Sequence, residues 1–275
     1  RSEVRTEETN LGNITADANL WYAQQTDSET IISLKNGGGI RSAIGDRYVP
    51  AGSVDYEMTT GPPPAIESVG KPEGGISQFD IEGSLRFNNG LTLLNLTAAE
   101  LWDVMEHAVA ATEEGATPGQ FPQIGGMRFS FDPSRQARDG DTANMGADTN
   151  GRRIRDLVIV DEAGNVTDRV IVDGELQGDP DRSFRLVTLG FLAGGGDGFP
   201  FEELSNPEML SLEESGQTVD PGRADFAPVG TEQDALAEYL RAEYARASSA
   251  ITMEELPKAE DTRIQNLNHR SSTLR

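Results

Sequence analysis

The sequence predicts an α+β fold, in which a mixed β-sheet is flanked by helices. Apolar residues recur at helical spacing in three segments, at residues 10–22, 97–109 and 231–247. Short apolar runs bounded by glycines and other turn residues predict strands, and the clearest of them cover residues 31–34, 125–131, 154–160, 166–172, 184–189 and 263–267. Together the two patterns indicate a mixed sheet system with helices packed beside it.

Composition and charge exclude several classes of protein. The chain of 275 residues is long enough to bury a core, as one large domain or two small ones. Its net charge of −23 argues against a nucleic-acid backbone or an anionic membrane as partner. No apolar run approaches the roughly 18 residues of a membrane-spanning helix. The lack of cysteine excludes disulfides, thiolate metal sites and a cysteine nucleophile. We therefore expect no nucleic-acid partner and no membrane span.

The first predicted helix begins at Asn10, which we expect to be its N-cap, and Leu11 and Ile14 lie on its apolar face. Arg1 and Arg5 precede this helix, four residues apart. By residue type alone, they are two solvated arginines at a chain end. The first residues include no apolar signal region, so we expect the sequence to start at a domain boundary of a longer protein.

Two glycine-rich loops follow predicted strands and end in opposite charges. One reads Asn-Gly-Gly-Gly-Ile-Arg at residues 36–41, and the other reads Phe-Leu-Ala-Gly-Gly-Gly-Asp at residues 191–197. Glycines at the end of a strand let the backbone approach a ligand closely. The guanidinium of Arg41 suits a phosphate, and the carboxylate of Asp197 suits hydroxyl groups such as a ribose diol. One such loop alone is more often a tight turn, but the pair predicts two walls of one site.

The helix predicted over residues 97–109 is expected to be scaffold. Thr97 and Glu100 have the spacing of a capping box, and Leu101 and Val104 belong to a clear core-facing stripe. His107 lies away from that stripe. Because no other metal-ligand residue stands at a suitable spacing from it, we expect His107 to be a surface histidine.

Four segments are expected to lie outside the core. Residues 45–75 and 201–230 are rich in proline, glycine or acidic residues and are interpreted as surface insertions. Residues 139–144 resemble a calcium loop at first sight, but they lack the later ligands and the glycine that the EF-hand pattern requires, so we expect a polar hairpin loop. Residues 269–275 are expected to form a loose tail.

Three motifs, in this order, carry a resemblance to a known family. They are Glu-Thr-Asn-Leu-Gly-Asn at residues 8–13, the loop at residues 36–41, and the loop at residues 191–197. The sequence resembles the C-terminal domain of the 5'-nucleotidase family, which includes UDP-sugar hydrolases and 2',3'-cyclic-nucleotide phosphodiesterases. The resemblance spans nearly the whole chain and implies one nucleotide-binding domain over residues 1–268.

The resemblance implies how such a domain would contact the nucleoside part of a nucleotide. Phe87 and Phe191 would form a clamp around the base, and base–aromatic stacking tolerates different bases. Asn36 and Asn89 would hydrogen-bond the edge of the base. Asp197 would bind the ribose hydroxyls.

The resemblance also implies a phosphate side. Arg41, Arg5 and Arg1 would face the phosphate, and Gly38 and Gly195 would line the substrate.

The segment around Phe87 departs in part from the family pattern, which is Pro-Phe-Gly-Asn. Phe87 and Asn89 match this pattern, whereas Arg86 and Asn88 stand where it has proline and glycine. These replacements leave the shape of the loop and the preferred base open.

No catalytic metal site is expected in this chain. Its two histidines, His107 and His269, belong to no metal-ligand motif. Hydrolysis in the resembled family depends on two divalent metal ions held by an N-terminal metallophosphoesterase domain, and such a pair clamps the attacking and leaving oxygens. We therefore expect this chain to bind a nucleotide or nucleoside, to act with that N-terminal domain, and to be inactive alone. The resemblance implies a periplasmic, cell-surface or secreted location.

Three alternatives remain open at this point. The chain could be a nucleoside-binding module without hydrolase activity, or a scaffold that has kept the fold and lost the site. The parent enzyme could also act on a nucleotide sugar or a 2',3'-cyclic nucleotide, because a base clamp does not distinguish these from a monophosphate.

Overall fold

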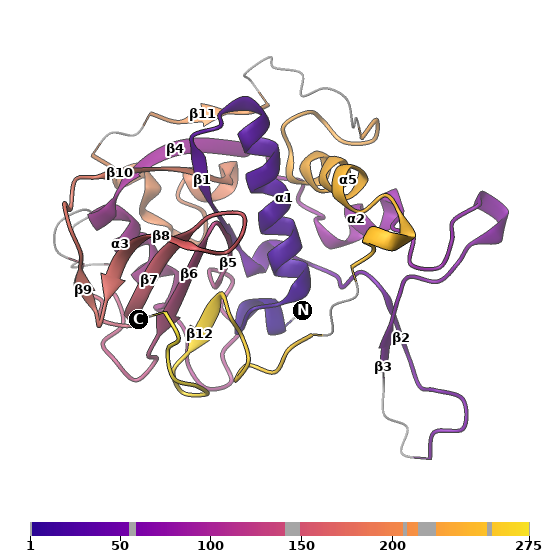
Figure 1. Cartoon of the computed structure of the whole chain (residues 1–275), viewed down its shortest axis with the longest axis horizontal. Helices are drawn as coiled ribbons and strands as arrows, with labels where there is room; N and C mark the ends of the chain where they lie inside the picture. Colours follow the sequence, from indigo (N-terminus) through magenta and orange to yellow (C-terminus); the bar gives the residue numbers. More distant parts are fainter. Residues whose placement is uncertain are drawn as a thin grey trace.

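The computed structural model describes residues 2–54, 59–140, 149–205, 208–213, 224–251 and 255–274. Within these residues, strands form two five-stranded sheets and a separate two-stranded hairpin (Figure 1). The first sheet has the order β11-β4-β10-β1-β5, with β1 Thr30–Asn36, β4 Leu91–Thr97, β5 Pro122–Gly125, β10 Ser183–Leu189 and β11 Leu210–Ser211. The second has the order β12-β6-β7-β8-β9, with β6 Met127–Phe131, β7 Ile154–Val160, β8 Val166–Val172, β9 Glu175–Leu176 and β12 Ile264–Asn266.

Both sheets are mixed, which confirms the predicted α+β fold. In the first sheet β1 pairs with β10 in parallel, and its other pairs are antiparallel. In the second sheet β12 pairs with β6 in parallel. The helices are α1 Asn10–Thr26, α2 Gln78–Ser84, α3 Ala98–Val109, α4 Gly190–Ala193 and α5 Glu232–Glu243. Short 3₁₀ helices are η1 Glu3–Arg5, η2 Gly37–Gly39, η3 Glu67–Val69, η4 Gly196–Gly198, η5 Pro200–Glu203 and η6 Ala247–Ser249.

The strand expected over residues 125–131 is divided between the two sheets. Gly126 separates β5 from β6 and has a φ of +72°, a conformation that disfavours other residues. A Cβ atom at Gly126 would lie 1.9 Å from the backbone oxygen of Ile31. The chain can therefore turn from one sheet into the other only because this position is glycine.

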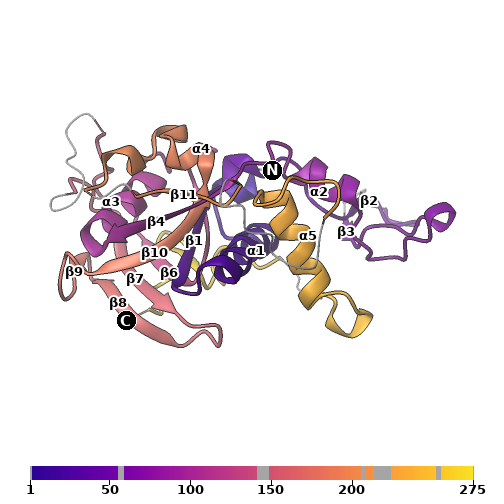
Figure 2. The same cartoon turned by 90° about the horizontal axis from the view of Figure 1, so that it is seen from above.

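The main core lies between the sheets and around α3, which packs against β4 of the first sheet and β7 and β8 of the second. Figure 2 shows α1 and α5 lying beside each other, away from α3. The Tyr22 hydroxyl on α1 donates to Asp234 Oδ2 on α5 at 2.8 Å. The Trp21 and Tyr239 rings of the same two helices lie 5.7 Å apart. This pairing attaches α5 to the body of the domain.

The helix termini agree with the predictions in part. Thr97 and Glu100 form both hydrogen bonds of a capping box at α3, as predicted. The prediction for α1 was wrong by one residue, because Thr9, rather than Asn10, is the N-cap and accepts from the Gly12 N–H. Asn10 is instead the first helical residue, and its backbone N–H donates to the carboxylate of Glu255. Helix α5 ends at Glu243, before the expected residue 247.

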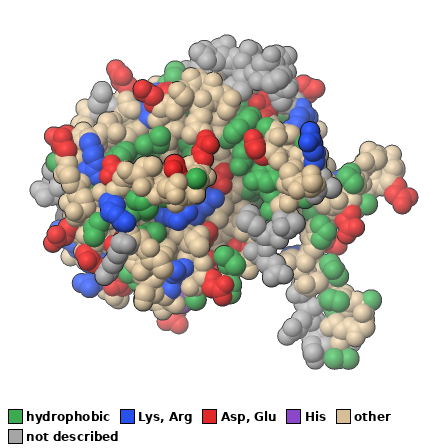
Figure 3. Space-filling model, viewed as in Figure 1, with side chains coloured by type: hydrophobic (Ala, Val, Ile, Leu, Met, Phe, Trp, Pro, Cys, Tyr) green, Lys and Arg blue, Asp and Glu red, His purple; other side chains and the backbone are tan. Residues whose placement is uncertain are grey.

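The segment expected as the first insertion projects from the body (Figures 1 and 2). It contains the hairpin of β2 Asp46–Tyr48 and β3 Thr59–Gly61. Hydrophobic and acidic side chains lie along this projection (Figure 3), and Val54 and Val69 are 83% and 74% exposed.

The C-terminal residues, which we expected to form a loose tail, are held against the second sheet. The Thr273 N–H donates to Gln265 Oε1 at 2.9 Å, and the Leu274 side chain is buried. Arg169 of β8 donates to the Leu274 carbonyl. The expectation that residues 201–230 lie outside the core was wrong for part of this segment, because Phe201, Leu204 and Leu212 are buried in the main core and β11 pairs with β4. Most of the expected hairpin loop, residues 141–144, and residues 206–207 and 214–223 of this segment lie outside the described residues. In the part of the chain that is described, no helix has both the length and the apolar character needed to cross a bilayer.

Candidate functional site

The two glycine loops meet at one edge of the first sheet. Because β1 and β10 are parallel neighbours, their carboxyl ends lie side by side, and each loop begins where its strand ends. Asn36, the last residue of β1, donates from Nδ2 to Oδ2 of Asp197 at 2.7 Å. Asn36 is buried, whereas Asp197 is exposed. The buried amide of one loop thus orients the exposed carboxylate of the other.

The glycines of η2 are needed for packing against the protein's own backbone. The Gly37 and Gly38 N–H groups donate to the Phe121 and Gly119 carbonyls at 2.7 and 2.8 Å. A Cβ atom at Gly37 would lie 1.7 Å from the Val4 oxygen, and one at Gly38 would lie 2.8 Å from the Gly119 oxygen. Close approach therefore explains these glycines, as expected, but the group that approaches at Gly37 and Gly38 is backbone from the same chain.

The second loop contains two residues in the left-handed conformation, Gly195 and Asp197. After β10 the chain forms the short helix α4 and then η4, whose flanking residue Gly195 has a φ of +79°. Asp197 itself has a φ of +52°, which is uncommon for a residue with a side chain but is best tolerated by Asp and Asn. The carboxylate is therefore presented from a constrained turn.

His107 of α3 is half-buried and supports this turn, a role that the sequence analysis did not predict. Its Nε2 lies 3.0 Å from the backbone oxygen of Asp197, and since a carbonyl only accepts, Nε2 carries the hydrogen. The ring packs edge-on against Phe199, with 4.9 Å between centroids. Burial lowers the pKa of His107, which favours the neutral ring. Helical periodicity gave no signal for this contact, because the loop returns to α3 only in the folded chain.

Phe87 and Phe191 are both exposed, at 60% and 46%, as are Phe79 and Tyr48 elsewhere in the described residues. The Gly190 N–H donates to the Gly90 carbonyl at 2.7 Å, which joins the segments that carry the two rings. A Cβ atom at Gly196 would lie 2.6 Å from two carbons of the Phe191 ring. Phe191 therefore rests on the backbone of its own glycine loop.

Arg41 connects the first loop to Phe87. Its guanidinium carbon lies 5.3 Å from the centre of the Phe87 ring, within cation–π distance. Its Nη1 donates to the Gly38 carbonyl at 3.1 Å. The guanidinium of Arg41 thus contacts both the Gly38 backbone and the exposed Phe87 ring.

Arg5 lies on η1, next to η2. Its Nη1 donates to the Thr117 carbonyl at 3.3 Å, while its Nε is buried and has no hydrogen-bond partner among the described residues. Arg1 lies outside the described residues.

Asn89 faces the interior rather than the two rings. Its backbone N–H and its Nδ2 donate to Glu232 Oε1 at 3.1 and 2.9 Å. Lys35 donates to the other oxygen of Glu232 at 2.8 Å, and both charged side chains are fully buried. Sequence reasoning missed this pair, although a lysine in a buried strand signals that a buried acidic partner is required.

Asn88 keeps the loop shape that a glycine would give. It has a φ of +46°, in the left-handed region where asparagine is the most tolerated residue after glycine. Its side-chain oxygen accepts from the Gln233 N–H at 3.2 Å. The departure from glycine at this position is therefore compatible with a glycine-type turn.

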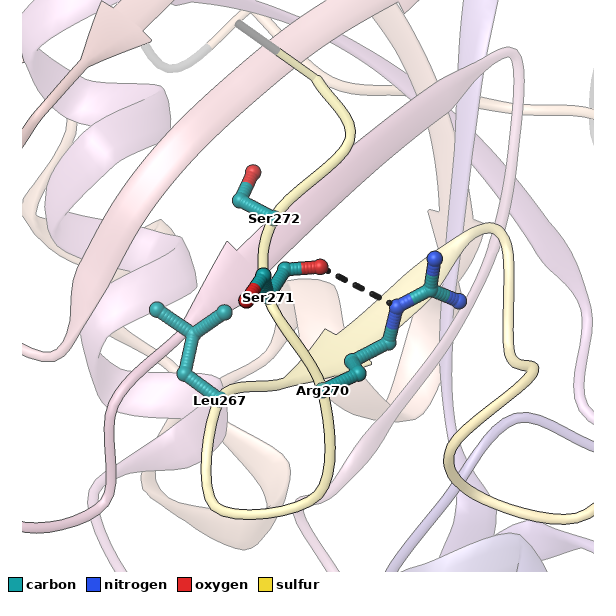
Figure 4. A pocket seen from close by; sticks show the side chains of 4 residues that line it. All are labelled: Leu267, Arg270, Ser271 and Ser272. Carbon is teal, nitrogen blue, oxygen red and sulfur yellow. Dashed lines mark hydrogen bonds between the residues drawn. The ribbon is translucent and has the colours of Figure 1, made fainter.

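The described residues include no group of three or more His, Cys, Asp or Glu side chains that could hold a metal ion, so this part of the chain does not fit a metal centre. Two shallow cavities lie away from the loops. One of about 310 Å³ is lined by Leu267, Arg270, Ser271 and Ser272 (Figure 4). The other, of about 330 Å³, is lined by residues of α2, of α5 and of the segment that precedes α5. Neither of these two cavities is lined by residues of the glycine loops.

The fold and this edge define a class of α+β domain in which two glycine loops follow parallel strands and are joined by a hydrogen bond, one loop carrying an arginine and the other an exposed phenylalanine. The sequence pattern described as "5'-nucleotidase, C-terminal domain" matches residues 1–203, and the chain belongs to this family. The resemblance noted from the motifs is thereby confirmed.

Individual relatives agree with this assignment. The chain is 27% identical over 211 residues to the trifunctional nucleotide phosphoesterase protein YfkN of Bacillus subtilis strain 168, covering 76% of this chain and 11% of that protein. It is 25% identical over 222 residues to the 5'-nucleotidase of Rattus norvegicus, covering 79% of this chain and 30% of the relative. The solved 5'-nucleotidase precursor from Thermus thermophilus superposes with a TM-score of 0.61 at 25% identity, covering 97% of this chain and 37% of that one. The chain thus spans about a third or less of each of these proteins.

Proposed function

We propose that this chain is the substrate-binding domain of a 5'-nucleotidase-type phosphoric ester hydrolase. The observation that carries the proposal is the hydrogen bond between Asn36 and Asp197, at 2.7 Å, between two loops that also present Arg41 and Phe191. Two exposed rings, one carboxylate and one guanidinium are the groups that a base, a ribose and a phosphate would each require.

In this proposal the base stacks on Phe87 and Phe191. Exposed aromatic rings stack on bases with a free energy of about 1–3 kcal/mol per base, largely irrespective of base identity. Asp197 accepts from the ribose hydroxyls, and Asn36 holds that carboxylate in place through Nδ2. The family resemblance also implies a contact from Asn36 to the edge of the base, and turning the amide to make that contact would break its hydrogen bond to Asp197.

The phosphate side is formed by Arg41 and Arg5, and the family resemblance adds Arg1, which lies outside the described residues. Arginine suits this role because its planar guanidinium binds two phosphate oxygens at once. The backbone at Gly38 and Gly195 lines the ligand. Arg5 is half-buried, with its Nε inside the protein, and the hydrogen bond from its Nη1 to the Thr117 carbonyl orients the guanidinium.

Hydrolysis in this proposal takes place at two metal ions of an N-terminal metallophosphoesterase domain, to which this domain presents the phosphate. Such metal ions stabilise the attacking and leaving oxygens. The domain described here binds without cutting, and the parent enzyme works in the periplasm, at the cell surface or outside the cell.

The test is calorimetric titration of the chain with adenosine, AMP and UMP. We expect saturable binding that Phe87→Ala and Phe191→Ala each weaken about tenfold or more, since each removes one stacked face. Phe79→Ala is the matched control, because Phe79 is another exposed ring, 79% accessible, on α2. Equal effects of all three substitutions, or no binding of any nucleotide, would contradict the proposal. Tighter binding of a nucleotide sugar or a 2',3'-cyclic nucleotide than of AMP would instead reassign the substrate.

A further inference from the structure

We infer that Glu232, paired with Lys35, is a positioning residue that fixes the Phe87 loop (residues 85–90) relative to the Asn36–Arg41 loop, and that Asn89 is the anchor of the Phe87 loop rather than a reader of the base. This inference rests on the proposed function. It assigns a binding role to α5, which lies beyond the residues 1–203 that match the family.

Lys35 and Glu232 form a buried ion pair. Lys35 Nζ lies 2.8 Å from Glu232 Oε2, and both side chains have no exposed surface. Two charges removed from water are costly unless they are paired and their remaining hydrogen-bonding groups are satisfied. Here the second carboxylate oxygen of Glu232 accepts both the N–H and the Nδ2 of Asn89, so both carboxylate oxygens are hydrogen-bonded.

The ion pair adjoins both binding loops, one in the sequence and the other through the hydrogen bonds to Asn89. Lys35 directly precedes Asn36, the residue that orients Asp197. Asn89 follows Phe87 by two positions. One buried carboxylate therefore joins the end of β1 to the Phe87 loop. If either segment shifted, the ring that stacks on the base would move relative to the carboxylate that binds the ribose.

The start of α5 is hydrogen-bonded to several residues of the Phe87 loop. The Glu232 N–H donates to the Asn89 carbonyl at 2.9 Å, and the Gln233 side-chain amide donates to the Leu85 carbonyl at 2.8 Å. The Gln233 N–H donates to the Asn88 side chain at 3.2 Å. The start of α5 thus holds both ends of the turn and its left-handed residue, while the ring of Phe87 between them is left exposed.

A purely structural role for the pair is the alternative. Buried ion pairs can often be replaced by apolar residues of similar volume without loss of stability. Such a replacement separates the two roles, because it can leave the fold intact while removing the acceptor that holds Asn89.

The experiment compares two double variants by adenosine calorimetry, with thermal unfolding measured for each. In Lys35→Met/Glu232→Leu we expect the adenosine Kd to rise at least tenfold. The matched control is Arg138→Met/Asp103→Leu, which replaces a second buried pair, also 2.8 Å apart with side chains 4% and 0% exposed. That pair joins α3 to residue 138 and does not connect the two binding loops. We therefore expect the adenosine Kd of this control variant to stay within twofold of the wild type. Wild-type affinity in the first double variant would overturn the inference.

A cycle with Phe87→Ala distinguishes positioning from general destabilisation. If the pair acts through Phe87, replacing it in the Phe87→Ala background should weaken binding less than twofold further, because coupled residues are not additive. A full additional tenfold loss would contradict the inference, whereas the proposed function would stand as long as Phe87→Ala alone weakens binding.

Asn89→Ala provides a test that leaves the ion pair intact. An anchor affects every base alike, so the affinities for adenosine and uridine should fall by the same factor. A selective loss for one base would show that Asn89 reads the base edge and would overturn its assignment as an anchor. If the wild-type chain binds neither nucleoside nor nucleotide, both the inference and the proposed function fail.

Discussion

Phe191 illustrates how one residue at the site depends on the size of another. The ring is nearly half exposed, yet its position is fixed because it lies on Gly196. An added Cβ there would be 2.4 Å from the Phe191 oxygen and 2.6 Å from two ring carbons, distances at which one of the groups must move. A glycine in this loop is therefore required by the ring beside it.

Gly196→Ala should accordingly displace the Phe191 ring. We expect adenosine affinity to fall about as far as in Phe191→Ala, roughly tenfold, since a displaced ring stacks poorly. Gly194→Ala is the control, because a Cβ atom there meets only ordinary contacts, with the Gly190 oxygen at 3.5 Å, and its φ of −87° suits alanine. Calorimetry on both variants checks this, and equal affinities would mean that Phe191 does not contact the base.

At the scale of elements, the sequence predicted β7 and β8 to the residue, because their apolar runs are bounded by a clear turn. It also predicted α3, whose capping box and apolar stripe are local features. The strand over residues 125–131 was predicted as one element, whereas Gly126 divides it between two sheets. A glycine inside a strand pattern was the available signal.

For the candidate site, too, local features could be predicted from the sequence and long-range contacts could not. The two glycine loops, Phe87 and Asp197 stood out because each follows a strand or matches a motif. The contacts that orient them were not predictable, since His107 lies 90 positions from Asp197 and Lys35 lies 197 positions from Glu232. Periodicity describes one element at a time and carries no information about which element it will meet.

At the scale of the whole molecule, the net charge of −23 has a consequence for stability. Asp261 is buried and lies near Glu8 and Glu7, and burial followed by these charges raises its pKa to about 7. Burial likewise raises the pKa of Glu106 to about 7. Between the unfolded pKa values near 4 and the folded values near 7, the native state binds more protons than the unfolded state, so stability falls as pH rises through this window.

Asp261→Asn should remove the part of this pH dependence that Asp261 contributes. At pH 8 the folded variant no longer holds a buried carboxylate beside other acids, so we expect its free energy of unfolding to exceed that of the wild type by on the order of 2 kcal/mol. At pH 4, where the carboxyl is protonated in the native state, the difference should largely disappear. Urea unfolding at both pH values measures this, and an equal difference at pH 4 and pH 8 would contradict the explanation.

The central claim is that segments distant in the chain form one nucleotide site at the carboxyl ends of β1 and β10. The most direct measurement is the change of backbone amide NMR signals of this chain on titration with AMP. We expect saturable shifts concentrated in residues 36–41, 85–90 and 190–199, with the β7–β8 hairpin and the projecting β2–β3 hairpin unaffected. Shifts confined to the cavity at Leu267–Ser272, or no saturable shifts at all, would contradict the account.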